Sequence, residues 1–172
     1  MAATKGLALL LYTIWYFMES FFKTCVDLFV PASLRQQKDV TGEVVLVTGG
    51  GNGLGRQLAV KFARLKATVV IWDINQLWNE ETARLIRESG GVVHPYTVDV
   101  SKPDQVYAAA DRVRQDVGDV TILVNNAAIL HYKPPLECPD EVIQKTLGVN
   151  ALSHFWVRSR DGRGRQVEMT NG

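Results

Sequence analysis

Apolar and polar positions form blocks along this chain, and the blocks have the lengths and periods of strands and helices. Short apolar runs at 44–47, 68–72, 92–98 and 121–124 predict four buried strands, because a strand covered on both faces is apolar throughout. Three segments between the runs repeat their apolar positions at helical spacing, at 56–66, 80–89 and 104–117, and a longer helix opens at Pro139. Strands that alternate with helices predict an α/β fold with a parallel sheet.

The N-terminal stretch has a different pattern. Residues 6–22 are almost wholly apolar apart from Glu19, and a second apolar patch covers 26–30. A spanning helix needs about 20 apolar residues, so three arrangements are open. The segment crosses a bilayer with tilt, lies in the interface, or enters and returns as a short hairpin. Aromatic side chains such as Tyr12 and Trp15 suit the headgroup boundary.

The alternatives to a membrane anchor are a cleaved signal peptide and an amphipathic helix packed on the folded domain. No small-x-small cleavage site follows the apolar run. We therefore expect an N-terminal apolar membrane helix within residues 1–30. Residues 31–41 are expected to be a polar linker, and residues 42–157 a folded domain.

Composition limits the other partners. The 172 residues carry a net charge of +1, so no electrostatic argument favours nucleic acid. Cys25 and Cys138 are far apart in the sequence, which argues for a reducing compartment and against a disulfide framework. The three histidines are scattered singly, so we expect no metal site.

A glycine-rich turn follows the first predicted strand. It reads Thr48-Gly49-x-x-x-Gly53-x-Gly55, with Asn52 and Leu54 inside it, and a helix follows at once. Glycines allow a sharp turn and a close approach to a pyrophosphate, and the helix N-terminus offers unpaired N–H groups to the anion. This arrangement predicts a dinucleotide site.

The second predicted strand ends at Asp73, roughly 20 residues beyond the glycine turn. A carboxylate at this point is placed to accept hydrogen bonds from the adenosine ribose hydroxyls, and its charge would repel a 2′-phosphate. Asn52 is neutral where a phosphate-binding site often has a basic residue. Both residues favour NAD over NADP, while a helix or turn cap is the alternative role for Asp73.

Three further motifs follow in order. They are Asp99-Val100 after the third predicted strand, Asn125-Asn126-Ala127-Ala128 after the fourth, and Asn150 in the long helix. Together with the glycine turn they resemble the short-chain dehydrogenase/reductase family, over about residues 43–156. The resemblance implies a Rossmann-type doubly wound parallel sheet. It also implies an adenine contact for Asp99, with Ala128 replacing the usual glycine of an Asn-Asn-Ala-Gly motif.

Narrower segments resemble one branch of that family, the membrane-bound retinol and 17β-hydroxysteroid dehydrogenases. They are 72–75, 79–82 and 136–141. This resemblance implies oxidation of a lipophilic alcohol, retinol or a steroid, with NAD. It also implies attachment to the endoplasmic reticulum or a lipid droplet with the domain facing the cytosol.

The family's catalytic groups are a tyrosine, a lysine four residues later, a serine and a helix asparagine that supports a proton-relay water. Asn150 matches the asparagine, but the sequence contains no Tyr-x-x-x-Lys. The alternative function is therefore a catalytically inactive, truncated isoform that binds cofactor, or that pairs as a homodimer or with a full-length relative. Composition changes after Trp156, and we expect strands 1–4 only, an exposed edge at 121–124, and a disordered tail over 158–172.

Overall fold

A computed structural model of the chain describes residues 2–29, 38–131, 134, 137–160 and 165–166, within two compact units, 1–38 and 39–172. The first unit contains one helix, α1 (Ala2–Phe29), whose side chains from Leu11 to Thr24 are exposed. Lys23 Nζ lies 2.8 Å from Glu19 Oε1. Within the described part of the chain, no helix combines the length and the apolar character needed to cross a membrane. Most of the predicted linker, residues 31–37, lies outside the described residues.

The second unit is built on a parallel sheet, as predicted. Its strands are β1 (Val44–Thr48), β2 (Thr68–Asp73), β3 (Val92–Thr97), β4 (Ile122–Val124) and β5 (Arg165–Gln166), in the order β3-β2-β1-β4-β5. Val47 of β1 is in register with Ile71 of β2 and Val124 of β4. The chain reverses its direction of travel across the sheet at β1, because β2 and β3 lie on one side of it and β4 on the other. Ligands of such sheets bind at that point, outside the carboxyl ends of the strands.

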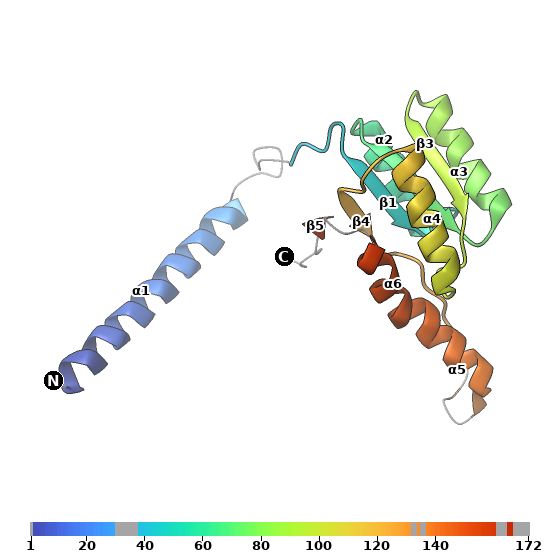
Figure 1. Cartoon of the computed structure of the whole chain (residues 1–172). Coiled ribbons are helices and arrows are strands. Elements are labelled where there is room, and N and C mark those ends of the chain that lie inside the picture. Colours follow the sequence, from blue (N-terminus) through green and yellow to red (C-terminus); the bar gives the residue numbers. More distant parts are fainter. Residues whose placement is uncertain (1, 30–37, 132–133, 135–136, 161–164, 167–172) are drawn as a thin grey trace. The chain divides into compact units, whose positions relative to one another are not determined.

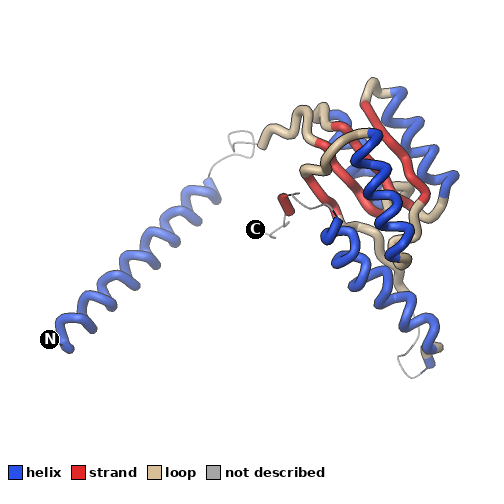
Figure 2. Tube along the Cα trace, viewed as in Figure 1, coloured by secondary structure: helices blue, strands red, loops and turns tan. Residues whose placement is uncertain are grey.

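Helices cover both faces of the sheet (Figures 1 and 2). One face packs Val45 and Val47 against α2 (Gly53–Arg64) and α3 (Gln76–Glu88). The other packs Leu46 against α4 (Pro103–Asp116) and the last helix. Successive side chains of a strand point to opposite faces, so the continuous apolar run of β1 supplies both cores.

The long C-terminal helix is interrupted once. It runs as α5 (Asp140–Leu147), a π-helical turn η3 (Gly148–Leu152) and α6 (Ser153–Arg160), with Pro139 at the N-cap. The π turn, which carries Asn150, was not predicted. Such turns occur mostly as single insertions and are frequent at functional sites.

The predicted exposed edge at 121–124 is wrong in one respect. Arg165 and Gln166 form β5, which pairs in parallel with Ile122 and Leu123. Pairing of this kind uses backbone groups, so the polar side chains after Trp156 do not prevent it. Of the predicted disordered tail, residues 158–160 complete α6 and 165–166 form β5, while 161–164 and 167–172 lie outside the described residues.

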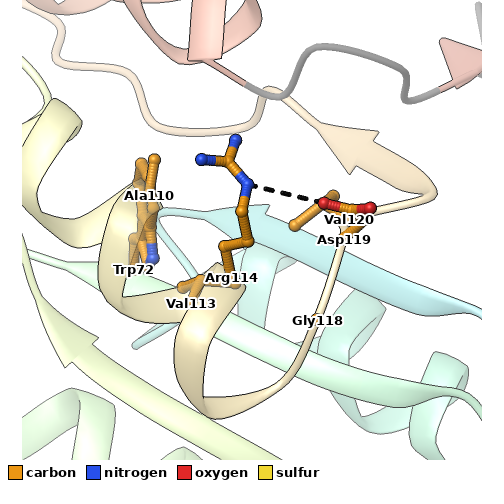
Figure 3. A pocket seen from close by; sticks show the side chains of 7 residues that line it. All are labelled: Trp72, Ala110, Val113, Arg114, Gly118, Asp119 and Val120. Carbon is orange, nitrogen blue, oxygen red and sulfur yellow. Dashed lines mark ion pairs between the residues drawn. The ribbon is translucent and has the colours of Figure 1, made fainter.

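A small hollow lies where α4 turns into β4, beside the buried ring of Trp72 (Figure 3). Arg114 of α4 borders it, and its Nε lies 3.5 Å from Asp119 Oδ1 in the turn. Trp72 is only 1% exposed, and its Nε1 has no hydrogen-bond acceptor among the described residues.

Candidate functional site: a nucleotide cleft at the end of the sheet

The glycine turn joins β1 to α2 in a conformation that needs glycine. Gly49 and Gly53 have φ values of +66° and +55°, in the left-handed region that side chains disfavour. Between them Asn52 is the N-cap of α2, and its Oδ1 accepts a hydrogen bond from Gly53 N at 2.8 Å. The start of a helix leaves N–H groups without intrahelical acceptors and carries a partial positive charge, so the N-terminus of α2 beside the cleft suits an anion.

Two other glycines of the turn permit close contacts. A Cβ at Gly55 would overlap the Gly49 carbonyl oxygen, and one at Gly51 would lie 2.7 Å from Asp73 Oδ2. The backbone of the turn therefore packs directly on itself and on the end of β2. A side chain at Gly55 would require movement of the Gly49 backbone, and one at Gly51 would displace the Asp73 carboxylate.

The Asp73 carboxylate is held by two backbone donors. Its Oδ2 accepts from Gly51 N and its Oδ1 from Asn75 N, each at 2.9 Å. Both roles considered for this residue from the sequence are thus compatible, because each carboxylate oxygen can accept a second hydrogen bond. Asp73 caps the local turn and still lines the cleft.

Thr48 and Asn126 connect the ends of β1 and β4. Thr48 Oγ1 accepts from Asn126 N at 3.1 Å and from Ala127 N at 3.2 Å. In return, Asn126 Nδ2 donates to Thr48 O at 3.0 Å and to Gly49 O at 3.2 Å. These bonds keep the two strand ends in place where the sheet opens toward the cleft.

A cavity of about 420 Å³ lies at this edge of the sheet. Eight of the predicted cofactor residues line it: Gly49, Asn52, Gly53, Asp73, Asp99, Val100, Asn126 and Ala127. Four others do not: Thr48, Leu54, Gly55 and Asn125. Of these four, Thr48 bonds the backbone after β4 and Gly55 packs against the Gly49 carbonyl, so both contribute to the shape of the turn.

Asp99 is half-buried at the cavity wall and shapes the loop before α4. Its Oδ1 accepts from Ser101 N at 2.9 Å and Ser101 Oγ at 2.6 Å, while its own N–H donates to Gln105 Oε1 at 2.9 Å. The carboxylate is therefore oriented before any ligand arrives.

Asn150 lies in a second cavity of about 380 Å³, which shares Ile129 with the first. Its side chain bonds the backbone of Ile129 in both directions, with Oδ1 accepting from Ile129 N at 2.9 Å and Nδ2 donating to Ile129 O at 2.8 Å. Apolar side chains from the same helix, Ile143 and Leu147, line this second cavity. The loop after β4 is thus attached to the π turn.

The sequence profile of the short chain dehydrogenases matches residues 43–160. The chain belongs to the short-chain dehydrogenase family. The fold agrees: a short-chain type dehydrogenase/reductase from Mycobacterium marinum superposes with a TM-score of 0.68 at 28% identity, covering 72% of this chain and 50% of that one.

Two curated relatives are dehydrogenases of lipophilic alcohols by name. Human epidermal retinol dehydrogenase 2 is 51% identical over 123 residues, which cover 71% of this chain and 40% of that protein. Mouse estradiol 17-beta-dehydrogenase 11 is 45% identical over 134 residues, covering 78% of this chain and 44% of that one. This member of the short-chain dehydrogenase family thus spans less than half the length of these two relatives.

The residues of the short-chain dehydrogenase cleft fit a dinucleotide. Gly49 and Gly53 line the cleft without a side chain, which leaves room for a pyrophosphate, and Asp73 provides acceptors at the neighbouring strand end. Among the described residues, no group of three or more His, Cys, Asp or Glu side chains is placed to hold a metal ion.

The remaining residues of the cleft wall lie outside the predicted cofactor set: Trp72, Ile74, Trp78, Val98, Ala128, Ile129, Lys145 and Val149. A signal for Trp78 was present, because Asn75 is an N-cap residue type and its Oδ1 accepts from Trp78 N at 3.1 Å. Helix α3 therefore begins at Gln76, before the predicted start at residue 80. Lys145 reaches the cleft only through the tertiary position of α5, which no local pattern indicates.

Proposed function

We propose that this chain is the nucleotide-binding part of an oxidoreductase that uses NAD to oxidise a lipophilic alcohol. The observation that carries the proposal is the Asp73 carboxylate, which lines the cleft beside the glycine turn. Its charge favours the hydroxyls of the NAD ribose and opposes the 2′-phosphate of NADP. The nicotinamide ring, when bound, supplies hydride transfer to or from the carbinol carbon.

The cofactor preference is measured by titrating the full-length chain, in detergent micelles, with NADH and then with NADPH. Trp78 lines the cleft, so bound nicotinamide should quench tryptophan fluorescence. We expect NADH to bind at least about tenfold more tightly than NADPH, since one unfavourable charge contact is worth about 1.4 kcal/mol or more at this range. Asp73→Asn removes the charge, and we expect it to narrow the difference between the two cofactors. A preference for NADPH in the unaltered chain would contradict the NAD assignment.

For the substrate we propose retinol or a steroid alcohol, supported by the similarity to a retinol dehydrogenase and an estradiol dehydrogenase. The 172 residues contain no Tyr-x-x-x-Lys, so cofactor binding is the property proposed for the chain itself, without turnover. Alcohol oxidation by the purified chain, dependent on added NAD, would contradict this part of the proposal.

We also propose that α1 binds membranes of the endoplasmic reticulum or lipid droplets, with the nucleotide-binding domain on the cytosolic side. The support is the exposure of large apolar side chains along the helix, including Trp15 at 68% and Phe17 at 78%. Co-sedimentation with phosphatidylcholine vesicles tests it. The double variant Trp15→Ser, Phe17→Ser should remain in the supernatant, and retention of vesicle binding by this variant would count against α1 as the anchor.

Pairing with a second copy or with a full-length relative is a second candidate function. Apolar side chains of the long helix are exposed, with Leu147 at 54% and Phe155 at 69%. Light scattering after size exclusion should give a dimer mass for the unaltered chain and a monomer mass for Phe155→Glu. A monomer in both cases would remove support for self-pairing.

A further inference from the structure

Two side chains outside the predicted cofactor set converge on one carbonyl of the glycine turn. Gly51 O accepts from Arg56 Nε at 3.0 Å, from Arg56 Nη2 at 2.6 Å, and from Thr82 Oγ1 at 3.0 Å. Arg56 comes from the first turn of α2, and Thr82 from the middle of α3, where it is fully buried. The Gly51 oxygen thus accepts from three donor atoms, two of which belong to the cationic guanidinium of Arg56, and charge-assisted hydrogen bonds are the stronger ones.

The N–H of the same residue is also fixed, because it donates to Asp73 Oδ2. Gly51 is thus held through both of its polar backbone groups, by Asp73 on one side and by Arg56 and Thr82 on the other. Such bonds matter most at glycine, which has no side chain to restrict its own backbone. A Cβ at Gly51 would meet the Asp73 carboxylate, so side-chain packing cannot replace them.

The direction of the Gly51 carbonyl has an electrostatic consequence. It points toward Arg56 and Thr82, so its negative end is neutralised there by a guanidinium and a hydroxyl. If this peptide unit rotated, the carbonyl oxygen would be free to face the anion expected at the start of α2, where donors are needed.

We propose that Arg56 and Thr82 are positioning residues that hold the Gly51 carbonyl toward α3 and thereby present the N–H side of the glycine turn to the cofactor pyrophosphate. This inference rests on the proposed function. It assigns Arg56 a role through the backbone rather than through direct contact with a phosphate. It also makes Thr82, more than 25 residues from the turn in sequence, part of the cofactor site.

Arg56 could contact a phosphate directly or position the Gly51 carbonyl, and the substitution Arg56→Lys distinguishes these two roles. Lysine keeps the charge but lacks the planar fork that places Nε and Nη2 on one acceptor. A phosphate contact would survive Arg56→Lys in large part, whereas the positioning role would not.

The test uses the full-length chain in detergent micelles. NADH and ADP-ribose report on the pyrophosphate, while adenosine, followed by ligand-observed NMR, lacks it. We expect Thr82→Val, Arg56→Lys and Arg56→Met each to raise the Kd for NADH and ADP-ribose about tenfold, the loss of roughly one charge-assisted hydrogen bond. Thr82→Ser restores the hydroxyl and should bind within about twofold of the unaltered chain. Adenosine affinity should be unchanged in all of these variants.

The double variant tests whether Arg56 and Thr82 act together. Because Arg56 and Thr82 share one acceptor, Arg56→Met combined with Thr82→Val should cost much less than the two single changes together. Equal losses of adenosine and ADP-ribose binding would mean that the pair merely stabilises the fold, and would overturn the inference. NADH binding unchanged in Thr82→Val and Arg56→Met would overturn it while leaving the proposed function intact. Failure of the unaltered chain to bind NADH would contradict both.

Discussion

The side chain of Asn150 bonds the Ile129 backbone twice, accepting from its N–H at 2.9 Å and donating to its C=O at 2.8 Å. An asparagine amide carries an acceptor oxygen and a donor NH₂ group, so one side chain satisfies both backbone groups. The bond pair connects the π turn of the long helix to the loop after β4. Ile129 lines both cavities, and Asn150 lines the second.

We expect Asn150→Ala to lower the free energy of unfolding by about 1–3 kcal/mol, because two backbone groups lose their partner. Asn150→Asp should cost at least as much, since a carboxylate would face the Ile129 carbonyl. Urea unfolding of the full chain measures both. Gln144→Ala, on the exposed face of α5, is the control and should stay within about 0.5 kcal/mol.

Gly53 and Gly55 form a matched pair for testing the glycine turn. At Gly53 no other part of the chain lies near an added Cβ and only the φ of +55° is unfavourable, so Gly53→Asn should leave the free energy of unfolding nearly unchanged. Because Gly53 lines the cleft, we expect its new side chain to weaken NADH binding directly. At Gly55 a Cβ would overlap the Gly49 carbonyl oxygen, so Gly55→Ala should lower the free energy of unfolding as well as NADH binding. Equal free energies of unfolding for the two variants, measured with urea, would mean that the turn can rearrange around a methyl group.

The Trp72 indole provides a test of buried polarity. Its Nε1 has no acceptor within the described part of the chain, and an unsatisfied buried donor costs about 1–3 kcal/mol. Trp72→Phe removes this unsatisfied donor, and we expect that gain to offset the lost apolar contact area. The free energy of unfolding should therefore change by less than about 1 kcal/mol. Trp72→Ala should cost about 3–5 kcal/mol by leaving a cavity. Similar losses in the two variants, measured with urea, would contradict this account.

Tyr96 makes stability depend on alkaline pH. Burial of its ring, together with the hydrogen bond from its hydroxyl to Asp116 Oδ2 at 2.9 Å, raises the pKa of Tyr96 from 10.0 to about 12. The folded-state pKa is the higher one, so its contribution to stability is complete below about pH 10 and is lost as the pH rises toward 12. Unfolding free energies at about pH 9 and pH 11 should differ more in the unaltered chain than in Tyr96→Phe. An equal pH dependence would exclude this tyrosine as the source.

Local pattern was enough to predict the core of the fold. The β-branched run of β1, the glycine turn and the helical period of α2 occur in one continuous segment, so their order alone specifies a strand, a turn and a helix. The third strand was predicted correctly although it contains Pro95. It lies at the edge of the sheet as β3, where the missing N–H of a proline is tolerated. Asp73 was located for the same reason, because a strand end is visible in the sequence.

Long-range hydrogen bonds could not be predicted in this way. Thr82 reads as an ordinary position of a charged helix, and only the packing of α3 beside the glycine turn brings its hydroxyl to Gly51. The same holds for β5, where backbone groups pair irrespective of side-chain type. The π turn gives no local signal either, because Gly148–Leu152 continues an apolar helical pattern without a break.

The π turn at Gly148–Leu152 also sets the helix phase. One extra residue in a turn rotates everything beyond it by about 100° relative to a regular helix. The half before it, α5, buries no side chain, while Val149 within the turn and Val157 beyond it lie in the core. The side chains of α5 therefore line the second cavity, whereas Val149 and Val157 pack in the core beside the sheet. Removing a single residue from the turn would leave a straighter helix in which one of these two alignments is lost.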